Sequence, residues 1–335
     1  MAYFYFCRSL TGDEYDASST NSVSFAAYRV SYKLFTAYLL SLISWKTPLG
    51  RFVISPKENE ETTFLSPAEN LFKVYDGVET FVMFIGYPRS SHSLVGAILD
   101  AHPEIVIPHE FNLMQKWKKY QSSILKKKTC RKILYFTTFT IFPRDKLCLG
   151  YVQEPIVIGD KKGGDTSFIL IDPNKLSVLE EINQVVQVPM KFIHVTRNPF
   201  DNISTMLLRN TRSRDSVREE GARVNRTRGL DVIIGRYFEL AASNQRVRER
   251  YGDAVIDIPG HETVLRPKET LQRLCDHLGV TCSEDYLEKC SKIMFGTPSV
   301  TRDKVVWSEE QIMRVTELMK SYPFLEDYSF DKYHS

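Results

Sequence analysis

Residues 81–93 decide the fold of this chain; they read Phe-Val-Met-Phe-Ile-Gly-Tyr-Pro-Arg-Ser-Ser-His-Ser. The first five are apolar, and Gly86 ends the run. Such a run is typical of a strand that is buried on both faces of a parallel sheet. Apolar residues between Leu94 and Leu99 then recur at helical spacing, and Pro103 disfavours further helix. We therefore predict a strand, a polar loop and a helix in direct succession.

The alternation of strand and helix continues along the chain. Four more short apolar runs lie at 104–108, 155–159, 191–196 and 254–258. Helical spacing of apolar residues marks 176–187, 199–209, 231–250, 267–279, 284–294 and 308–320. This pattern predicts an α/β fold, a three-layer sandwich with a mostly parallel central sheet. Residues 1–76 do not share the pattern, so we expect an N-terminal helical or irregular extension before a domain at 77–335.

Composition excludes several classes of protein. With 43% apolar and 25% charged residues, the chain is an ordinary globular protein rather than a collagenous or disordered one. Its 44 Lys and Arg against 41 Asp and Glu give a net charge of only +3, so we expect no nucleic acid partner. The six cysteines form no CxxC pair, and no histidine or carboxylate cluster has metal-ligand spacing. We therefore expect no metal.

The most membrane-like stretch is short. Leu34–Trp45 is twelve residues long, whereas a helix that spans a bilayer needs roughly 20. We predict an amphipathic or partly buried helix over 24–45; a signal anchor and a membrane-surface helix remain the alternatives.

The loop after the first predicted strand, Gly86–Ser93, has the character of an anion site. It leads into a helix N-terminus, where backbone N–H groups and the helix dipole favour negative charge. It also carries Arg89 and several hydroxyl groups. The loop lacks the glycine and lysine of a Walker A motif, which argues against an ATPase or kinase site. The alternative is that the serines only cap the helix.

A second loop of the same kind follows the strand at 191–196. Arg197 offers a fork for phosphate, Asn198 suits a helix N-cap and Pro199 suits the first helical turn. The Thr205 hydroxyl follows about two turns into the helix. Because parallel strands end at one edge of the sheet, both loops should face the same ligand. We therefore expect a ligand with two separated phosphate groups.

These residues resemble the sulfotransferase family that uses 3′-phosphoadenosine 5′-phosphosulfate (PAPS). Gly86–Ser90 followed by Leu99–Pro103 is similar to the 5′-phosphosulfate loop of the branch that carries arginine rather than lysine. Arg197–Thr205 looks like the 3′-phosphate segment, in which a hydroxyl residue follows an arginine by eight positions. The resemblance covers residues 80–330 and implies a P-loop-like sulfotransferase fold with its catalytic domain at 77–335. The chain departs from the family at Ser91-His92-Ser93, where Gly-Thr-Thr is commoner.

The resemblance also implies roles for individual residues. The expected catalytic residues are Glu110, Arg89, His92 and Lys162. The expected cosubstrate-binding residues are Arg89, Ser90, Ser91, His92, Ser93, Arg197, Thr205, Arg302 and Lys304. Glu110 stands 21 residues after Arg89, the spacing of the general-base glutamate in protein-tyrosine sulfotransferases.

Several of these assignments have alternatives. Glu110 is otherwise a surface acid or an ion-pair partner, with His109 and His194 as weaker candidates for the base. His92 either hydrogen-bonds the sulfonate or fills the helix N-terminus. Lys161 competes with Lys162 for the transferring group, and a solvated turn would need neither.

The implied activity is transfer of a sulfonate group from PAPS to a hydroxyl, with an amine as the other acceptor. The acceptor is open among a small molecule, a carbohydrate and a peptide. Basic stretches at 116–132 and 209–228 are solvated helix faces or attract an anionic acceptor or a membrane surface. A homodimer and peripheral membrane contact are further expectations. We expect a cytoplasmic enzyme; the Golgi lumen is the alternative, and the rival functions are a P-loop kinase or NTPase and a non-catalytic nucleotide-binding module.

Overall fold

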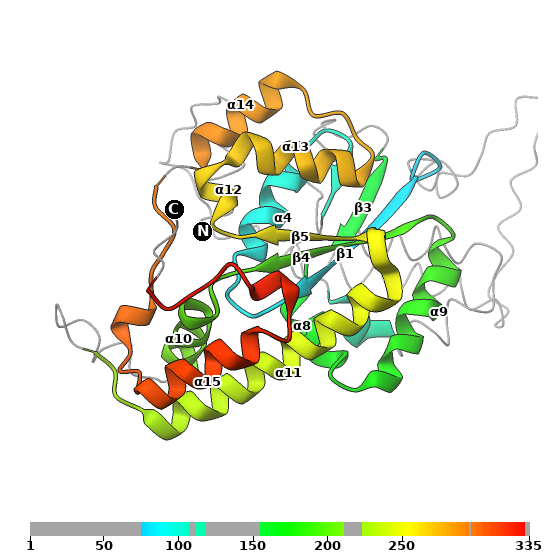
Figure 1. The fold of residues 1–335 in the computed structure, drawn as a ribbon. Coiled ribbons are helices and arrows are strands. Elements are labelled where there is room, and N and C mark those ends of the chain that lie inside the picture. Colours follow the sequence, from blue (N-terminus) through cyan, green and yellow to red (C-terminus); the bar gives the residue numbers. More distant parts are fainter. Residues whose placement is uncertain (1–74, 108–111, 118–154, 211–222, 295, 332–335) are drawn as a thin grey trace, which may run out of the picture. The chain divides into compact units, whose positions relative to one another are not determined.

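The computed structural model describes residues 75–107, 112–117, 155–210, 223–294 and 296–331 (Figure 1). These residues all belong to one compact unit. The predicted helix at 24–45 lies outside them, as does almost all of the predicted extension at 1–76. None of the described helices is long and apolar enough to cross a membrane.

Five strands form one sheet. They are β1 (Thr80–Gly86), β2 (Ile105–Val106), β3 (Val157–Asp160), β4 (Met190–Thr196) and β5 (Val255–Pro259). Their order is β2-β3-β1-β4-β5, and every pairing among them is parallel. All five predicted strands are confirmed. The position of β3 between β1 and β2 could not be predicted from the sequence. The order of strands along the chain, in which β2 follows β1 directly, does not fix their order in the sheet.

Helices cover both faces of the sheet (Figure 1). On one face, apolar residues of β1 and β4 form a core with α4 (His92–Asp100), α13 (Pro267–Leu278) and α14 (Glu284–Ile293). On the other, α8 (Gly163–Ile169) and α11 (Thr227–Tyr251) contact β1, and α11 packs with α10 (Pro199–Asn210) and α15 (Glu309–Met319). The predicted three-layer α/β sandwich is therefore confirmed.

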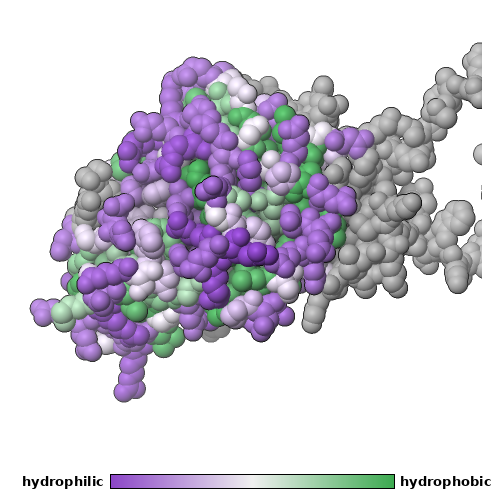
Figure 2. Space-filling view, turned by 45° about the vertical axis from the view of Figure 1, so that its right-hand side comes forward, coloured by the Kyte–Doolittle hydropathy of each residue, from purple (hydrophilic) through white to green (hydrophobic). Residues whose placement is uncertain are grey.

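The remaining elements are short or peripheral. They are η1 (Pro173–Lys175), α9 (Leu176–Val186), η2 (Gly252–Ala254), α12 (Glu262–Leu265), η3 (Arg302–Lys304) and η4 (Pro323–Leu325), with a helical segment at 113–117. On the face shown in Figure 2, hydrophilic side chains cover most of the described surface and the apolar patches are small. The described part of that face therefore shows no broad apolar docking surface.

Candidate functional site

The carboxyl ends of the strands surround one cavity of about 620 Å³. Its walls come from the loops that follow β1, β3, β4 and β5, and from the segment 297–301. Ligands of open α/β sheets bind at this edge, so the cavity lies where the fold predicts it. Both loops that were expected to bind phosphate contribute to it.

The β1–α4 loop is shaped by its backbone. Gly86 has φ of 143°, and a Cβ there would lie 2.8 Å from the carbonyl oxygen of Val195 in β4. Arg89 and Ser91 adopt left-handed φ values of 71° and 75°, which are uncommon for residues other than glycine. Ser91 is the N-cap of α4, so this turn aims the N-terminus of the helix at the cavity.

Four of the five predicted residues of this loop line the cavity. They are Arg89, Ser91, His92 and Ser93. Ser90 does not, because its side chain is completely buried behind the loop. Contact between the Ser90 hydroxyl and a cosubstrate therefore stays a prediction that this geometry does not support.

The β4–α10 loop is shaped by side chains. Arg197 Nη1 donates to Thr205 Oγ1 (2.9 Å), and its Nη2 donates to Thr301 Oγ1 (2.8 Å) and to the Ser299 carbonyl oxygen (2.8 Å). Nη1 also donates to the Arg89 carbonyl oxygen at 3.3 Å, so the two loops lie side by side. Burial lowers the pKa of Arg197, the nearby cations Arg89 and Arg302 lower it further, and Asp201 opposes them.

The acceptors around Arg197 decide what this loop can do. All four are neutral hydroxyl or carbonyl oxygens, so no carboxylate of the described residues is bonded to the guanidinium. Such a partly buried positive charge is stabilised when an anion binds, and Arg–phosphate pairs are among the strong hydrogen-bonded pairs in proteins. The geometry therefore fits an anionic group at Arg197.

The loop after β3 supplies the two lysines. Lys162 lines the cavity and forms an ion pair with Asp165 at 3.2 Å. Lys161 is buried, and its Nζ lies 3.4 Å from Ser93 Oγ in the first turn of α4. The residues that follow begin helix α8 rather than the solvated turn that was one of the two alternatives. Of the two lysines, Lys162 is therefore the one on the cavity wall.

The two predicted residues near the C-terminus do not reach the cavity. Arg302 is completely buried and forms an ion pair with Asp201 at 2.7 Å, and Lys304 is exposed without lining the wall. The expectation that they contact the cosubstrate stays a prediction, and this arrangement does not support it, because the Asp201 carboxylate holds the Arg302 guanidinium. What this segment does contribute is Thr301, which accepts a hydrogen bond from Arg197.

The predicted base, Glu110, lies outside the described residues, as does His109. The chain just beyond them is held by β3 and α8. Leu113 N–H donates to the buried Asp160 carboxylate at 2.5 Å, and Asn112 Nδ2 donates to Asp165 at 3.0 Å. Burial raises the pKa of Asp160, although the N–H groups that bond it act in the opposite direction.

The predicted site residues leave out several residues of the wall. Ser299 and Thr301 carry neither charge nor motif, and only their bonds to Arg197 reveal them. Gly260 and His261 follow β5, and the rule that ligands bind after parallel strands would have found them. A Cβ on Gly260 would lie 3.0 Å from the Ser90 carbonyl oxygen, so the β5 loop packs tightly on the β1–α4 loop.

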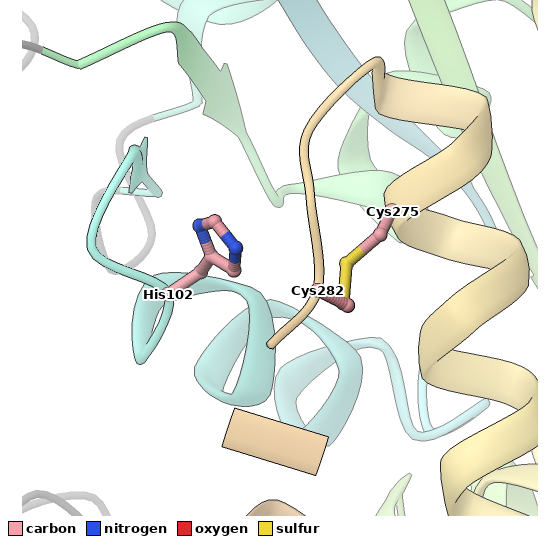
Figure 3. A group of neighbouring side chains, drawn as sticks. All are labelled: His102, Cys275 and Cys282. Atoms are coloured by element: carbon pink, nitrogen blue, oxygen red, sulfur yellow. A yellow bond between two sulfur atoms is a disulfide. The ribbon is translucent and has the colours of Figure 1, made fainter. Parts of the chain in front are cut away.

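Among the described residues, one group of potential metal ligands comes together: His102, Cys275 and Cys282 (Figure 3). The two sulfur atoms form a disulfide. His102 Nε2 lies 3.1 Å from the Thr281 carbonyl oxygen, and Nδ1 accepts from Glu104 N–H at 3.2 Å. If Nε2–H of His102 donates to the Thr281 carbonyl oxygen, both ring nitrogens have partners. With the two sulfur atoms in a disulfide, this arrangement fits a structural role better than a metal site. The expectation that the reaction needs no metal stays a prediction.

A cavity at the carboxyl ends of parallel strands, with helix N-termini and arginines from two loops, places the chain among α/β proteins whose site suits an anionic ligand. The model of the sulfotransferase family matches residues 82–284, more than half of the chain. This chain therefore belongs to the sulfotransferase family and is an enzyme of sulfonate transfer.

Several solved structures resemble the chain at low identity. The sulfotransferase domain of the Synechococcus PCC 7002 olefin synthase has 13% identity and a TM-score of 0.47, over 73% of this chain and 94% of that one. Sulfotransferase STF9 from Mycobacterium avium has 11% identity and a TM-score of 0.44, over 75% and 78%. Mouse sulfotransferase SULT7A1, complexed with PAP, has 14% identity and a TM-score of 0.41, over 75% and 87%.

Proposed function

We propose that this sulfotransferase transfers the sulfonate group of PAPS to a hydroxyl acceptor. One observation carries the proposal: two strand-to-helix loops bring Arg89 and Arg197 to the same cavity, in contact through the bond from Arg197 to the Arg89 carbonyl oxygen. A ligand with two separated anionic groups fits such a pair of loops. PAPS has this charge distribution, with a phosphate at the 3′ position and a phosphosulfate at the 5′ position.

Arg197, Thr205 and Thr301 are the residues that would hold the 3′-phosphate. The two hydroxyl groups already accept hydrogen bonds from Arg197. Each hydroxyl hydrogen can therefore point at an acceptor such as a phosphate oxygen. Thr205 donates to the Asp201 carbonyl oxygen at 2.8 Å, so a phosphate has to displace that bond. Both Nη groups of Arg197 already have two acceptors each, so a phosphate oxygen also has to replace a neutral acceptor there.

Arg89, His92 and Ser93, with the N-terminus of α4, would bind the 5′-phosphosulfate. In the reaction a bond forms between the acceptor oxygen and sulfur, the bond from sulfur to the 5′-phosphate oxygen breaks, and adenosine 3′,5′-bisphosphate (PAP) leaves. Negative charge grows on that phosphate oxygen, where fixed cations and N–H groups stabilise it most. Arg89 and Lys162 supply the cations, and Glu110 accepts the proton of the acceptor hydroxyl.

The residue types that line the cavity indicate which class of acceptor suits it. Among the described residues that line it there is no Phe, Tyr or Trp, whereas Lys162, Asp165 and His261 offer polar groups. Flat apolar acceptors are usually bound by apolar and aromatic side chains. The described wall therefore favours a polar alcohol or a carbohydrate over an apolar phenol or a tyrosyl ring.

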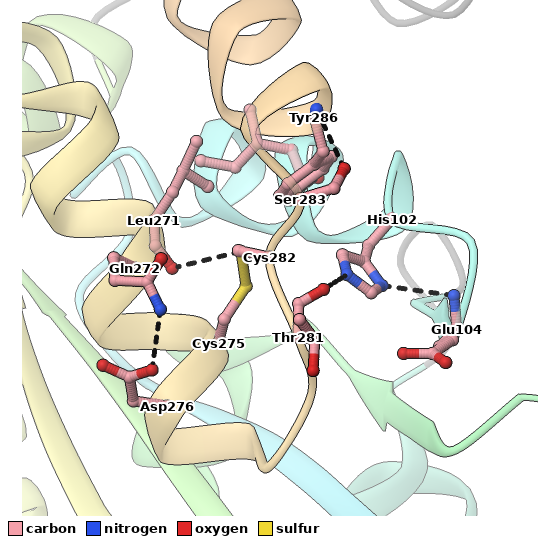
Figure 4. The surroundings of a disulfide bond; sticks show 11 residues. His102, Glu104, Leu271, Gln272, Cys275, Asp276, Thr281, Cys282, Ser283 and Tyr286 are labelled. Atoms are coloured by element: carbon pink, nitrogen blue, oxygen red, sulfur yellow. Dashed lines mark hydrogen bonds between the residues drawn. A yellow bond between two sulfur atoms is a disulfide. The ribbon is translucent and has the colours of Figure 1, made fainter.

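A disulfide joins Cys275, in α13, to Cys282, before α14 (Figure 4), and it bears on the cell compartment in which the protein works. Disulfides are rare in the cytosol, where thiols are kept reduced. We therefore favour an oxidising compartment such as the Golgi lumen over the cytoplasm predicted from the sequence. Alkylation of the protein in its own cells, followed by mass spectrometry, tests this: free Cys275 and Cys282 thiols would contradict it.

The function is tested on the purified full chain in two steps. Titration calorimetry should show binding of PAP without magnesium and no comparable binding of ATP with magnesium. Incubation with sulfur-labelled PAPS and a panel of alcohols, carbohydrates and tyrosyl peptides should give labelled product, and Glu110→Gln should abolish it. ATP binding would favour the kinase alternative, and PAP binding without product in any acceptor class would favour a non-catalytic module.

A further inference from the structure

Behind the β4–α10 loop lies a completely buried ion pair between Arg302 and Asp201. Arg302 Nη2 donates to Asp201 Oδ2 at 2.7 Å, and its Nε donates to Oδ1 at 3.1 Å. Neither residue lines the cavity. Any effect of the pair on the reaction therefore passes through other residues.

Both partners hold backbone as well as each other. Asp201 Oδ1 accepts the N–H groups of Thr301 (2.8 Å) and Arg302 (2.9 Å). Arg302 Nη1 donates to the carbonyl oxygens of Ser329 (2.8 Å) and Phe330. The ion pair thus ties three segments together: the first turn of α10, the segment 297–301 and the C-terminal residues 328–330.

These three segments meet at the candidate phosphate site. Thr301, fixed through its N–H by Asp201, accepts the hydrogen bond of Arg197. Asn198 lines the cavity, and its Nδ2 donates to the same Ser329 carbonyl oxygen that Arg302 bonds. A short chain of contacts therefore leads from the buried pair to the arginine that faces the ligand.

Charge sets the two arginines apart. Arg197 bonds four neutral acceptors, whereas Arg302, 0% exposed, has a carboxylate. A buried ion pair adds little stability over apolar residues of equal size, so its presence here calls for another reason. Fixing one arrangement of polar groups is such a reason, because groups ordered in advance do not lose freedom when the ligand binds.

We propose that Asp201 and Arg302 are positioning residues of this sulfotransferase, and that they make residues 328–330 part of the nucleotide-binding machinery. The inference rests on the proposed function, since it assigns the positioned group, Arg197, to the 3′-phosphate. The pair holds Thr301 and the C-terminal segment so that Arg197 and Asn198 keep the geometry that binds phosphate.

The test compares Asp201→Asn and Arg302→Lys with a matched control, Arg246→Lys. Arg246 also donates from one guanidinium nitrogen to two backbone carbonyl oxygens, those of Leu170 (2.7 Å) and Ile171 (3.0 Å), but it does not line the cavity. All four proteins are shown to be folded by circular dichroism before PAP affinity and steady-state rates are measured.

We expect the PAP dissociation constant and the KM for PAPS to rise about 10- to 50-fold in both variants of the pair, with kcat at saturating PAPS within about threefold of wild type. The control should lose thermal stability while its PAP affinity stays within about twofold. Equal PAP affinity of wild type and both pair variants would overturn the inference alone. A wild type that does not bind PAP would overturn the proposed function and this inference with it.

If the pair variants do not fold, Phe330→Ala tests the same proposal. The Phe330 ring anchors the C-terminal segment on Phe200 and Trp307, at centroid distances of 5.1 and 6.2 Å. Loss of this anchor should raise the KM for PAPS about three- to tenfold without a matching fall in kcat. An unchanged KM in a folded Phe330→Ala protein would contradict the role of the C-terminal segment.

Discussion

The β1–α4 and β4–α10 loops face the same cavity but are built in different ways. The first depends on backbone: Arg89 and Ser91 have left-handed φ values, and Ser91 caps α4 without a side-chain hydrogen bond. The second depends on side chains, because Arg197 is held by four acceptors from three different segments. The β1–α4 loop is therefore conformationally strained, whereas the β4–α10 loop is held in one conformation by hydrogen bonds.

This difference suggests a division of labour. A group that is already fixed pays little entropy when a ligand binds, so the β4–α10 loop suits binding of the 3′-phosphate, which does not react. The β1–α4 loop presents Arg89, Ser91 and Ser93 as exposed side chains at a helix N-terminus. Groups placed there act on charge that develops during the reaction. We therefore expect the first loop to govern turnover and the second to govern affinity.

The largest effect is expected from Arg89→Ala. Loss of one group that stabilises developing charge lowers kcat about 100- to 1,000-fold. The PAP dissociation constant should change less than about tenfold, because the remaining groups still bind the ground state. Steady-state kinetics and calorimetry on the same preparation provide the measurement, with exposed Arg314→Ala on α15 as the control. A loss confined to affinity would break the division of labour.

The converse is expected from Arg197→Ala. Two charge-assisted hydrogen bonds to phosphate would be lost, so the PAP dissociation constant should rise about 100-fold, or about 2.7 kcal/mol. At saturating PAPS, kcat should stay within about tenfold of wild type. Arg197→Lys keeps the charge but not the fork, and should lie between the two. A fall in kcat as large as that of Arg89→Ala would show that both loops serve turnover.

The framework of this comparison was readable in the sequence. Strands buried on both faces are continuous apolar runs, so 81–85 and 191–196 identify β1 and β4 directly. The rule that ligands bind at the carboxyl ends of parallel strands then selects Arg89 and Arg197 without any contact information. Both residues line the cavity.

The tertiary contacts that hold the two loops in place could not be predicted from the sequence. The family resemblance made Arg302 an expected ligand-binding residue, whereas its pairing with Asp201, about a hundred residues away, cannot be seen in the sequence. Helix α8 begins with Gly163 and Gly164, which disfavour helix on their own. A Cβ on Gly164 would lie 3.0 Å from the backbone nitrogen of Pro88, so close packing against the β1–α4 loop explains the glycine. Such tertiary contacts override local preference.

The pH dependence of stability tests the packing of β1 and β4, the two strands that precede these loops. His194 of β4 lies opposite Ile85 of β1, is completely buried and bonds Asp257 at 2.7 Å. Burial lowers the pKa of His194 below 6.5; the neighbouring Arg248 acts in the same direction, while Asp257 opposes both. The unfolded chain therefore takes up a proton that the folded protein resists. The stability from this group is present above about pH 6.5 and falls as the pH drops below that value.

The slope from one such group is at most about 1.4 kcal/mol per pH unit. Urea unfolding between pH 7.5 and 5.5 should show a smaller loss for His194→Gln than for wild type. The residual loss includes His277, since burial lowers its pKa as well. Identical pH profiles for the two proteins would show that His194 is not held neutral beneath the loops.

The smallest effect is expected from Ser91→Gly, and it tests the strain in the β1–α4 loop. The left-handed conformation costs a residue with a side chain about 1–2 kcal/mol, and glycine avoids this cost. Glycine also loses more conformational entropy on folding, which cancels part of the stabilisation. Ser91 makes no side-chain cap bond that would be lost. We therefore expect the free energy of unfolding to rise by about 0.5–1 kcal/mol.

Ser283→Gly is the matched control, because Ser283 is also a helix N-cap but has an extended backbone, and its side chain accepts from Tyr286 N–H. There the same substitution removes a cap and relieves no strain, so the free energy of unfolding should fall by a few tenths of a kcal/mol. Opposite signs in urea unfolding would locate the strain at Ser91. If both variants lost stability, the left-handed turn at Ser91 would cost nothing, and the contrast between a strained loop and an ordered one would no longer hold.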